Sequence, residues 1–443
     1  MFDREFINFI YHLQHTQEAY EVYNEYKLIY AKYPNTKVIL GVSDETDIFI
    51  PPGLKINFEN IYLRSYYSSE KLFFIDRETI NRMQTYEQIA FNIGYSIFAD
   101  TNVASDIHKF LQKKKLGQNQ KDIVSFIDRL LFYNLDFNFY YYIIENTKLI
   151  FRIYNRHKNK RTNYKLFWQD IKNEHPHFCE NLISLILFSK IDKKKYREFS
   201  SLKFTISEEE AEKKAIISLY ETYFNNNKNL RSDFTDIRNR FYHFYLLTIK
   251  ILSINFSSNN IASKKLLDLI SFMHNKLGYI AEREMIIAFN YFNNERRAKE
   301  FFQTINRGKQ TNNKKLQKKI QNLVWDLMLP RFIEHCLRSQ EQEKFFLPYL
   351  VTSDKKLSNL LDLYPIRGTV IEATSRQVIS LPEENVITFL ESLFNIDTLT
   401  KYFSQQAANY RTKVKDNFDK NPNAIFKLIK IEFKQLQLIL YNN

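Results

Sequence analysis

The hydrophobic positions of this chain predict helices over most of its length. Phe6 and Phe9 begin a series of apolar residues at the spacing of one helix face, so residues 1–35 are expected to form a helix. Residues 106–260 show helical spacing with many aromatic side chains, and residues 383–443 are expected to be helical as well. No repeat with a period of about 20 to 50 residues stands out.

Short apolar runs bounded by turn residues or acids predict a smaller number of strands. The expected strands are residues 38–40, 48–50, 94–99, 346–351 and 366–371. Pro348 falls inside the fourth run, and because proline lacks an N–H donor it argues against a central position in a sheet. Strands separated by long helical stretches predict an α/β fold in which helix predominates.

The composition favours an anionic partner without identifying one. The chain has 443 residues, with 64 Lys and Arg against 50 Asp and Glu, a formal net charge of +14. Such a charge favours nucleic acid first and a membrane surface second. Asn, Ile, Lys, Phe and Tyr are enriched together, as an AT-rich gene would cause, so composition bias could also explain the charge. With 7 Gly and no Gly-rich phosphate loop, nucleotide-driven motors and dehydrogenases are disfavoured.

The remaining compositional features predict a cytoplasmic protein. Cys179 and Cys336 are too few for a disulfide framework, which indicates a reducing compartment. The N-terminus carries no signal-peptide pattern. The most apolar stretch, residues 137–153, is interrupted by Glu145 and Lys148, so no segment reaches membrane-spanning length and no membrane partner is expected.

Two of the expected strands end in the same way, on an aspartate followed by helix-compatible sequence. Asp100 follows the strand at 94–99, and Asp354 follows the strand at 346–351. Ligands of parallel α/β sheets bind outside the carboxyl ends of the strands, so the two carboxylates converge if the strands are neighbours. Two close carboxylates repel each other, and a divalent cation relieves that repulsion. Oxygen ligands of this kind suit Mg²⁺ or Mn²⁺.

Two further acids lie on or beside apolar helix faces. Glu284 is in line with Ile287 at helical spacing, and Asp326 flanks a stripe that contains Leu323 and Leu327. An acid in such a place is costly unless it is paired, reaches solvent or binds a metal. Taken singly, each of the four acids also fits a structural role, as a helix cap or a surface residue.

The four acids, in this order, resemble the PIN domain superfamily of metal-dependent nucleases. Residues 97–102 look like the opening strand motif of that family, and residues 351–357 resemble its late strand motif, in which a hydroxyl residue precedes an acid. Residues 325–327 look like the third acidic position, and residues 283–288 are similar to the segment that carries the helical acid.

The resemblance covers about a third of the chain and departs from the family in spacing. Roughly 180 residues separate Asp100 from Glu284, which requires a large helical insertion and leaves Glu282 as a competing choice for the helical acid. The resemblance implies a PIN-like parallel sheet core and says nothing about residues 1–90, 113–260 and 385–443. Together with the hydrophobic pattern it predicts four regions. They are an N-terminal α+β accessory region at 1–90, a discontinuous core at 91–112 plus 262–380, a helical insertion at 113–261 and a helical segment at 381–443.

The resemblance also implies a chemistry, metal-assisted hydrolysis of phosphodiester bonds with RNA favoured over DNA. The implied catalytic residues and ligands of Mg²⁺ or Mn²⁺ are Asp100, Glu284, Asp326 and Asp354. Thr101, Asn102 and Thr352 would orient carboxylates or water, and the basic stretch 307–319 would hold the substrate backbone. A toxin or phage-defence effector, with an inhibitory or activating protein partner, follows by analogy with the family.

Two other interpretations remain open. Residues 238–243 match the Arg-Asn-x-x-x-His pattern of HEPN ribonucleases, which cleave RNA without metal, with Arg238 and His243 as the candidate site. Alternatively, the chain is a non-catalytic helical protein that binds nucleic acid or a partner, and its acids are helix caps. The sequence leaves the oligomeric state open.

Overall fold

The computed structural model of the chain is an α/β fold in which helix predominates, as the sequence predicts, with 68% of the described residues in helices. The structure describes residues 3–43, 58–69, 71–85, 93–133, 135–157, 163–224, 228–306, 312–338, 345–421 and 423–441. The expected strand at 48–50 lies outside these ranges. Within them, no helix is both long enough and apolar enough to cross a bilayer.

Two four-stranded sheets form the centre of the fold. The first is antiparallel and has the order β3 (Leu72–Ile75), β1 (Thr36–Gly41), β7 (Ile366–Glu372) and β8 (Gln377–Pro382). The second has the order β2 (Tyr62–Ser65), β6 (Phe345–Thr352), β4 (Ile93–Ala99) and β5 (Asp136–Asn138). In the second sheet β4, β5 and β6 are parallel and β2 is antiparallel to β6.

The sheets join segments that the sequence pattern assigned to different regions. Strand β2 comes from the expected accessory region 1–90, and β5 comes from the expected insertion 113–261, yet both belong to the sheet that contains β4 and β6. The sequence signal for β5 is weak because the strand is only three residues long.

The N-terminal segment forms two helices where the sequence predicts one. Helices α1 (Arg4–His15) and α2 (Ala19–Ile29) are separated at Thr16, whose hydroxyl donates to the carbonyl of Leu13, and a capping box of Glu18 and Glu21 begins the second helix. Both helices cover one face of the first sheet and bury a separate apolar cluster with it. Alternate side chains of β1 point to the two sides of this sheet, as strand geometry requires.

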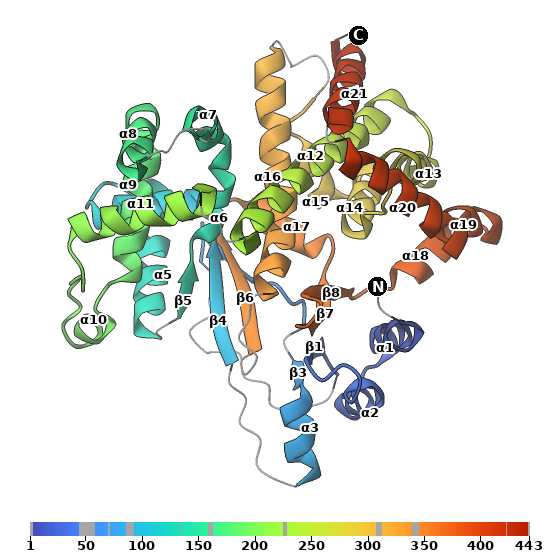
Figure 1. Cartoon of the computed structure of the whole chain (residues 1–443), viewed down its shortest axis with the longest axis horizontal. Coiled ribbons are helices and arrows are strands. Elements are labelled where there is room, and N and C mark those ends of the chain that lie inside the picture. Colours follow the sequence, from blue (N-terminus) through green and yellow to red (C-terminus); the bar gives the residue numbers. More distant parts are fainter. Residues whose placement is uncertain are drawn as a thin grey trace.

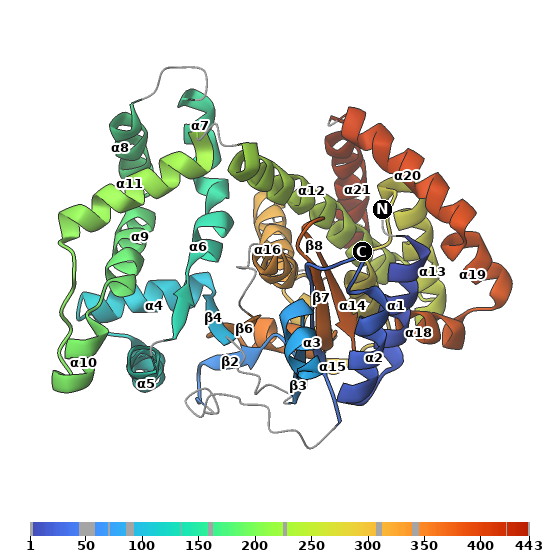
Figure 2. The same ribbon diagram turned by 60° about the horizontal axis from the view of Figure 1, so that its bottom comes forward.

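The remaining helices form two groups around the strands (Figures 1 and 2). The first group lies beside β5 and consists of α4 (Thr101–Leu111), α5 (Gln120–Phe132), α6 (Tyr140–Glu145), α7 (Thr147–His157), α8 (Tyr164–Glu174), α9 (Pro176–Ser189), α10 (Lys193–Phe199) and α11 (Glu208–Phe224). A short 3-10 helix at Gly117–Asn119 precedes α5, and α3 (Arg77–Gln84) follows β3.

The second group includes the helical C-terminal segment that the sequence predicts. Its members are α12 (Lys228–Ser257), α13 (Ala262–Phe272), α14 (Glu282–Phe292), α15 (Arg296–Phe302), α16 (Asn313–Leu337), α17 (Lys355–Asp362), α18 (Val386–Leu393), α19 (Ile396–Phe403), α20 (Gln405–Lys420) and α21 (Asn423–Tyr441). A π-helical turn ends α13, and Gly278 at φ 73° separates it from α14.

Pro348 occupies an inner strand, against the expectation from the sequence. Strand β6 lies between β2 and β4. The antiparallel ladder with β2 covers only Tyr349 to Thr352, so the missing N–H of Pro348 falls where β2 has ended. The carbonyl of Pro348 still accepts a hydrogen bond from the backbone N–H of Tyr66 at 2.9 Å. An inner strand therefore tolerates this proline at the end of a ladder.

We expect Gly368→Ala to destabilise the protein more than Gly117→Ala. A Cβ at Gly368 would lie 2.4 Å from the backbone oxygen of Ile39, so β1 would have to shift, at a cost of about 2 to 3 kcal/mol. At Gly117 the φ is positive but no atom lies within 4 Å, and we expect a loss of about 1 kcal/mol. Urea unfolding measures both; equal losses would contradict a steric role for Gly368.

Candidate functional site

The carboxyl ends of β4 and β6 place Asp100 and Asp354 at one edge of the second sheet. The two strands are adjacent and parallel, with Ala99 opposite Val351. The backbone N–H of Asp100 continues the ladder and donates to the carbonyl of Val351 at 3.1 Å. The sequence predicts that the two aspartates converge if their strands are neighbours and parallel, and β4 and β6 are both.

Thr352 connects the two aspartates. Its hydroxyl donates to Oδ2 of Asp100 at 2.5 Å, and its oxygen accepts from the backbone N–H of Asp354 at 2.9 Å. Oδ1 of Asp100 accepts from the N–H of Val103 at 2.8 Å, and Oδ1 of Asp354 accepts from the N–H of Lys356 at 2.8 Å. Both aspartates therefore cap the helices that follow them, α4 and α17, and the cap fixes the direction of each carboxylate.

Asp326 lies on α16, close enough to Asp100 and Asp354 for their charges to raise its pKa. Pro330, four residues later, lies inside this helix and has no N–H to offer to the carbonyl of Asp326. The helix nevertheless continues to Leu337. The hydroxyl of Tyr141 donates to the carbonyl of Trp325 at 2.6 Å, which ties α6 to α16 at this position.

Glu145, at the end of α6, is the fourth acid at this edge, and the sequence interpretation did not select it. Its carboxylate accepts a hydrogen bond from the hydroxyl of Thr101 and forms an ion pair with Lys148 at 3.6 Å. In the sequence, Glu145 interrupts the most apolar stretch of the chain. This feature argues against a membrane span and does not by itself indicate a site. We call Asp100, Glu145, Asp326 and Asp354 the carboxylate cluster.

The charges of the cluster are mutually unfavourable. Burial raises the pKa of Asp100 to about 7; the hydrogen bonds from Thr352 and Val103 oppose this rise, and the charges of Glu145 and Asp354 add to it. Burial also raises the pKa of Asp326 well above its usual range, and the charges of Glu145, Asp354 and Asp100 raise it further. A bound cation would remove this electrostatic cost.

The chemistry of the donors fits a hard divalent cation such as Mg²⁺ or Mn²⁺, because all four are carboxylates. As the side chains stand, no three His, Cys, Asp or Glu residues in the described ranges form a group that could hold a metal ion. Asp100 is 4% exposed, whereas the other three acids of the cluster are partly exposed. The cluster thus supplies oxygen donors at a solvent-facing edge of the sheet. A bound ion would need further ligands to complete its coordination.

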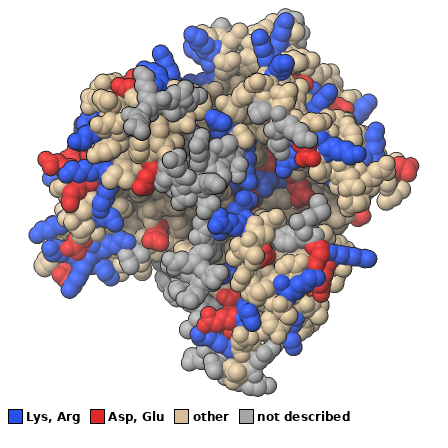
Figure 3. Space-filling view, viewed as in Figure 1, with Lys and Arg blue, Asp and Glu red and all other residues tan. Residues whose placement is uncertain are grey.

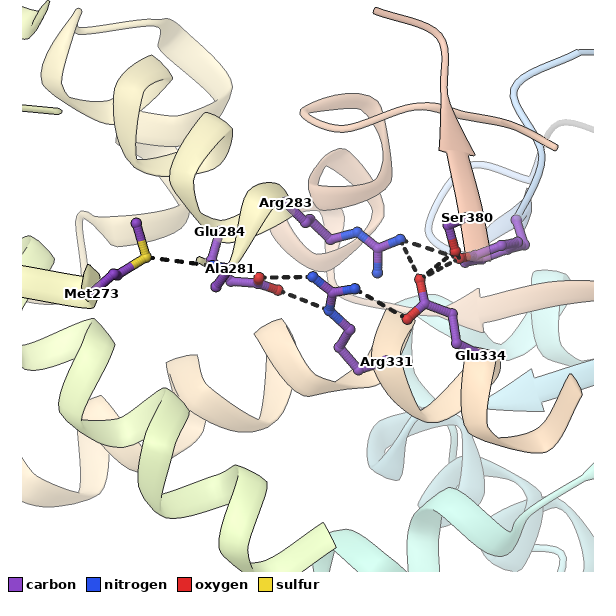
Figure 4. A network of polar contacts seen from close by, with 8 residues as sticks. Met273, Ala281, Arg283, Glu284, Arg331, Glu334 and Ser380 are labelled. Carbon is purple, nitrogen blue, oxygen red and sulfur yellow. Dashed lines mark hydrogen bonds and ion pairs between the residues drawn. The ribbon is translucent and has the colours of Figure 1, made fainter. Parts of the chain in front are cut away.

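Glu284, which the sequence placed with the aspartates, lies instead in a separate ion-pair network (Figure 4). Its carboxylate is fully buried and accepts two hydrogen bonds from Arg331, at 3.2 and 2.9 Å. Arg331 also pairs with Glu334, which in turn binds Arg283 at 2.8 Å. An acid on an apolar face needs a partner, and here the partner is an arginine.

The same network accounts for the neighbouring acids. Burial tends to raise the pKa of Glu334, but Arg283 and Arg331 hold it below its usual range. The competing acid Glu282 faces this network as well, since burial raises its pKa and the charge of Arg331 opposes the rise. Neither Glu282 nor Glu284 is placed among the carboxylates at the edge of the second sheet.

The auxiliary residues expected at the site have different environments. Thr352 and Thr101 donate to Asp100 and Glu145 respectively, whereas Asn102 is exposed. Of the basic stretch 307–319, residues 307–311 lie outside the described ranges. The remainder contains the N-cap and the first turns of α16.

The two residues of the HEPN-like pattern contact different parts of the fold. The guanidinium of Arg238 lies over the ring of Phe151 in α7, at 5.4 Å from its centroid. The ring of His243 lies against Tyr279 and Phe418, at centroid distances of 5.6 and 6.4 Å. Arg238 therefore contacts α7, whereas His243 contacts Tyr279 and Phe418.

Comparison with known proteins gives no further assignment: no family model, no curated protein and no solved structure matches this chain. The chemistry of the site therefore rests on the residues themselves.

We expect Asp100→Asn to remove part of the pH dependence of stability, measured in EDTA. Burial raises the folded-state pKa of Asp100 to about 7 from its ordinary value of 3.8. The folded state therefore binds the proton more tightly, and stability is lost as the pH rises from about 4 to about 7. Urea unfolding at pH 5 and pH 8 should show a smaller loss in Asp100→Asn than in wild type.

Asp192→Asn is the matched control for this prediction. Asp192 also caps a helix, α10, but it lies at the surface and hydrogen bonding from Lys195 lowers its pKa. The control should retain the wild-type loss of stability between the two pH values. Wild type and Asp100→Asn with equal losses would contradict a raised pKa of Asp100.

We expect Glu284→Ala to destabilise the fold. Removal of this buried partner leaves Arg331 with Glu334 alone, which Arg283 also binds, and breaking a buried pair costs about 3 to 5 kcal/mol. Glu300→Ala breaks an exposed pair with Arg296 and should cost less than about 1 kcal/mol. Both losses are measured by urea unfolding, and a loss at Glu284 no greater than that at Glu300 would contradict the structural role of the network.

Proposed function

We propose that the protein is a metal-dependent nuclease that hydrolyses phosphodiester bonds, with RNA as the favoured substrate. The observation that carries the proposal is the convergence of four carboxylates, from the ends of β4 and β6 and from α6 and α16, at one edge of the second sheet. Such an arrangement raises the cost of keeping the acids ionised, and a function that uses a cation explains why it is present.

The residues of the chain have separable tasks in this proposal. Bound Mg²⁺ or Mn²⁺ supplies charge stabilisation at the phosphate and activation of water. Asp100 and Asp354 are the central ligands, because Thr352 and the helix caps hold both carboxylates in fixed directions. Asp326 and Glu145 complete the site from the helical side, and Thr101 orients Glu145.

The preference for RNA and the biological role rest on the resemblance of the four predicted acids to PIN nucleases. Three of these acids, Asp100, Asp326 and Asp354, belong to the carboxylate cluster, and Glu145 takes the place proposed for Glu284. A role as a toxin or phage-defence effector, with a protein partner that inhibits or activates it, belongs to the same proposal.

A non-catalytic role is the second candidate, because one observation favours it. Asp100 and Asp354 both accept backbone hydrogen bonds as helix caps, so their presence has a structural explanation as well. This explanation does not extend to Asp326, which lies within α16 and whose pKa is raised by three neighbouring acids. Asp326 therefore discriminates between the two candidates.

We expect purified protein to cleave single-stranded RNA in Mg²⁺ or Mn²⁺ and to lose this activity in EDTA. Asp100→Asn, Asp354→Asn and Asp326→Asn should each lower kcat by about 100-fold or more, because each removes a ligand charge. Cleavage is followed by gel electrophoresis of a labelled oligoribonucleotide, with folding checked by circular dichroism.

The control is Asp106→Asn, a buried aspartate on α4 that pairs with Lys109 and lies outside the cluster. It should retain activity, as should His243→Ala. Cleavage that persists in EDTA and is lost in His243→Ala would exclude the metal-dependent mechanism. A folded protein that cleaves neither RNA nor DNA would favour the non-catalytic candidate.

A further inference from the structure

A groove lined by aromatic, amide and basic side chains lies between α12, α16 and α21. It holds a cavity of about 610 Å³ whose walls include Phe241, Tyr242 and Phe426, together with Gln317 and Gln321. Lysine side chains complete the rim from α21, at positions 430 and 434. Aromatic rings, amide groups and cations in one recess are the groups that recognise unpaired bases on a phosphate backbone.

A second cavity extends this groove toward the carboxylate cluster. It has a volume of about 200 Å³ and shares Phe241, Tyr242 and Gln321 with the first. Its other walls include Lys148, which pairs with Glu145, and Trp325, which precedes Asp326 in the chain. The two cavities therefore adjoin at shared side chains, and the walls of the second include two neighbours of the cluster.

The spacing along α16 shows how the two cavities align. Gln317, Gln321 and Trp325 follow one another at intervals of four residues, so they lie on one face of the helix. At a rise of about 1.5 Å per residue, this face spans about 12 Å. Asp326 is the next residue and lies about 100° around the helix from this face, so the stripe ends beside a member of the carboxylate cluster.

Unsatisfied polar groups and unpaired cations line the groove. Nε1 of Trp325 has no hydrogen-bond partner among the described residues, although the side chain is 4% exposed. Arg238, in the wall of the second cavity, stacks over Phe151 and pairs with no acid in the described part of the chain. Lys430 and Lys434 are exposed and form no ion pair with a described acid.

The two helices that flank the first cavity are also strongly basic. From its start to Trp325, α16 has four lysines and no acid, and α21 has three lysines and one acid, Glu432. The carboxylate of Glu432 is bound by Lys250 at 3.1 Å, so it does not neutralise the rim. Lys and Arg side chains gather where α16 begins and α21 ends, at the top of the view in Figure 3. This charge favours a polyanion over an apolar peptide.

We infer that single-stranded RNA binds in this groove, with bases against Tyr242 and Phe426 and phosphates against Lys430 and Lys434, and that it is guided along α16 to the carboxylate cluster. The aromatic side chains of this recess can stack with the unstacked bases of a single strand, which a duplex does not expose. Amide groups such as Gln317 can both donate to and accept from bases and 2′-hydroxyls, which suits RNA. The direction of guidance rests on the proposed function, whereas binding in the groove does not.

The test measures binding in EDTA, so that cleavage cannot contribute. Fluorescence anisotropy follows a labelled single-stranded oligoribonucleotide of mixed sequence across a series of salt concentrations. The double variant Lys430→Gln, Lys434→Gln should weaken binding at least tenfold. It should also reduce the slope of log Kd against log salt by about 1.4, since each phosphate contact on a single strand contributes about 0.7.

A matched pair of exposed lysines on α11 serves as the control. The double variant Lys213→Gln, Lys214→Gln changes the net charge equally, and it should leave both affinity and slope unchanged. Tyr242→Leu should weaken binding about tenfold with the salt slope unchanged, because a stacking contact and not a charge is removed. Thermal unfolding confirms that each variant is folded.

Several results would overturn the inference. They are the absence of RNA binding, equal effects of the groove and control lysines, tighter binding of single-stranded DNA of the same sequence, and equal or tighter binding of duplex RNA. Failure of the proposed function gives a different result, in which RNA binds in the groove but is not cleaved with Mg²⁺ or Mn²⁺. Conversely, if the Lys430→Gln, Lys434→Gln variant cleaves RNA with an unaltered KM, the result supports the proposed nuclease activity and contradicts RNA binding in the groove.

Discussion

The candidate site depends on the parallel pairing of β4 and β6. This pairing joins residues about 250 positions apart, as the contact between Asp100 and Thr352 shows. Closing such a loop has an entropic cost, which the buried apolar strands and the helices between them must offset. Because both strands run in the same direction, their carboxyl ends meet, and the acids that follow them meet as well. Without this pairing, Asp100 and Asp354 would be two separate helix caps.

The protein treats its buried charges in two contrasting ways. In the network of Arg283, Glu284, Arg331 and Glu334, each carboxylate faces a guanidinium, and the network ties α14 to α16. In the carboxylate cluster the acids face one another, and burial together with their mutual repulsion raises the pKa of Asp100. Compensated charges of the first kind support the fold. In the cluster only Glu145 has a cationic partner, Lys148, among the described residues, and mutual repulsion of this kind is a cost that natural proteins retain at functional sites.

The groove along α16 relates the basic character of the chain to this acidic edge. A pocket of carboxylates repels a polyanion, but the lysines of α16 and α21 present the opposite charge nearby. The net charge of +14 is not localised in the sequence, since lysines occur throughout it. In the fold, part of that charge borders aromatic and amide side chains in one recess. The same stripe of α16 then ends beside Asp326.

The sequence by itself determined the predominance of helix, the strands β1, β4, β6 and β7, and the aspartates that follow two of these strands. These features depend on the hydrophobic periodicity and the residue types of neighbouring positions, which the sequence shows directly. Only the tertiary structure decided the partners of the acids. Glu145 and Glu284 both interrupt apolar stretches, and nothing local indicates that one meets three carboxylates while the other meets Arg331. The strand pairings of β2 and β5 were undetermined for the same reason. Such contacts depend on which distant segments pack together, and no local pattern encodes them.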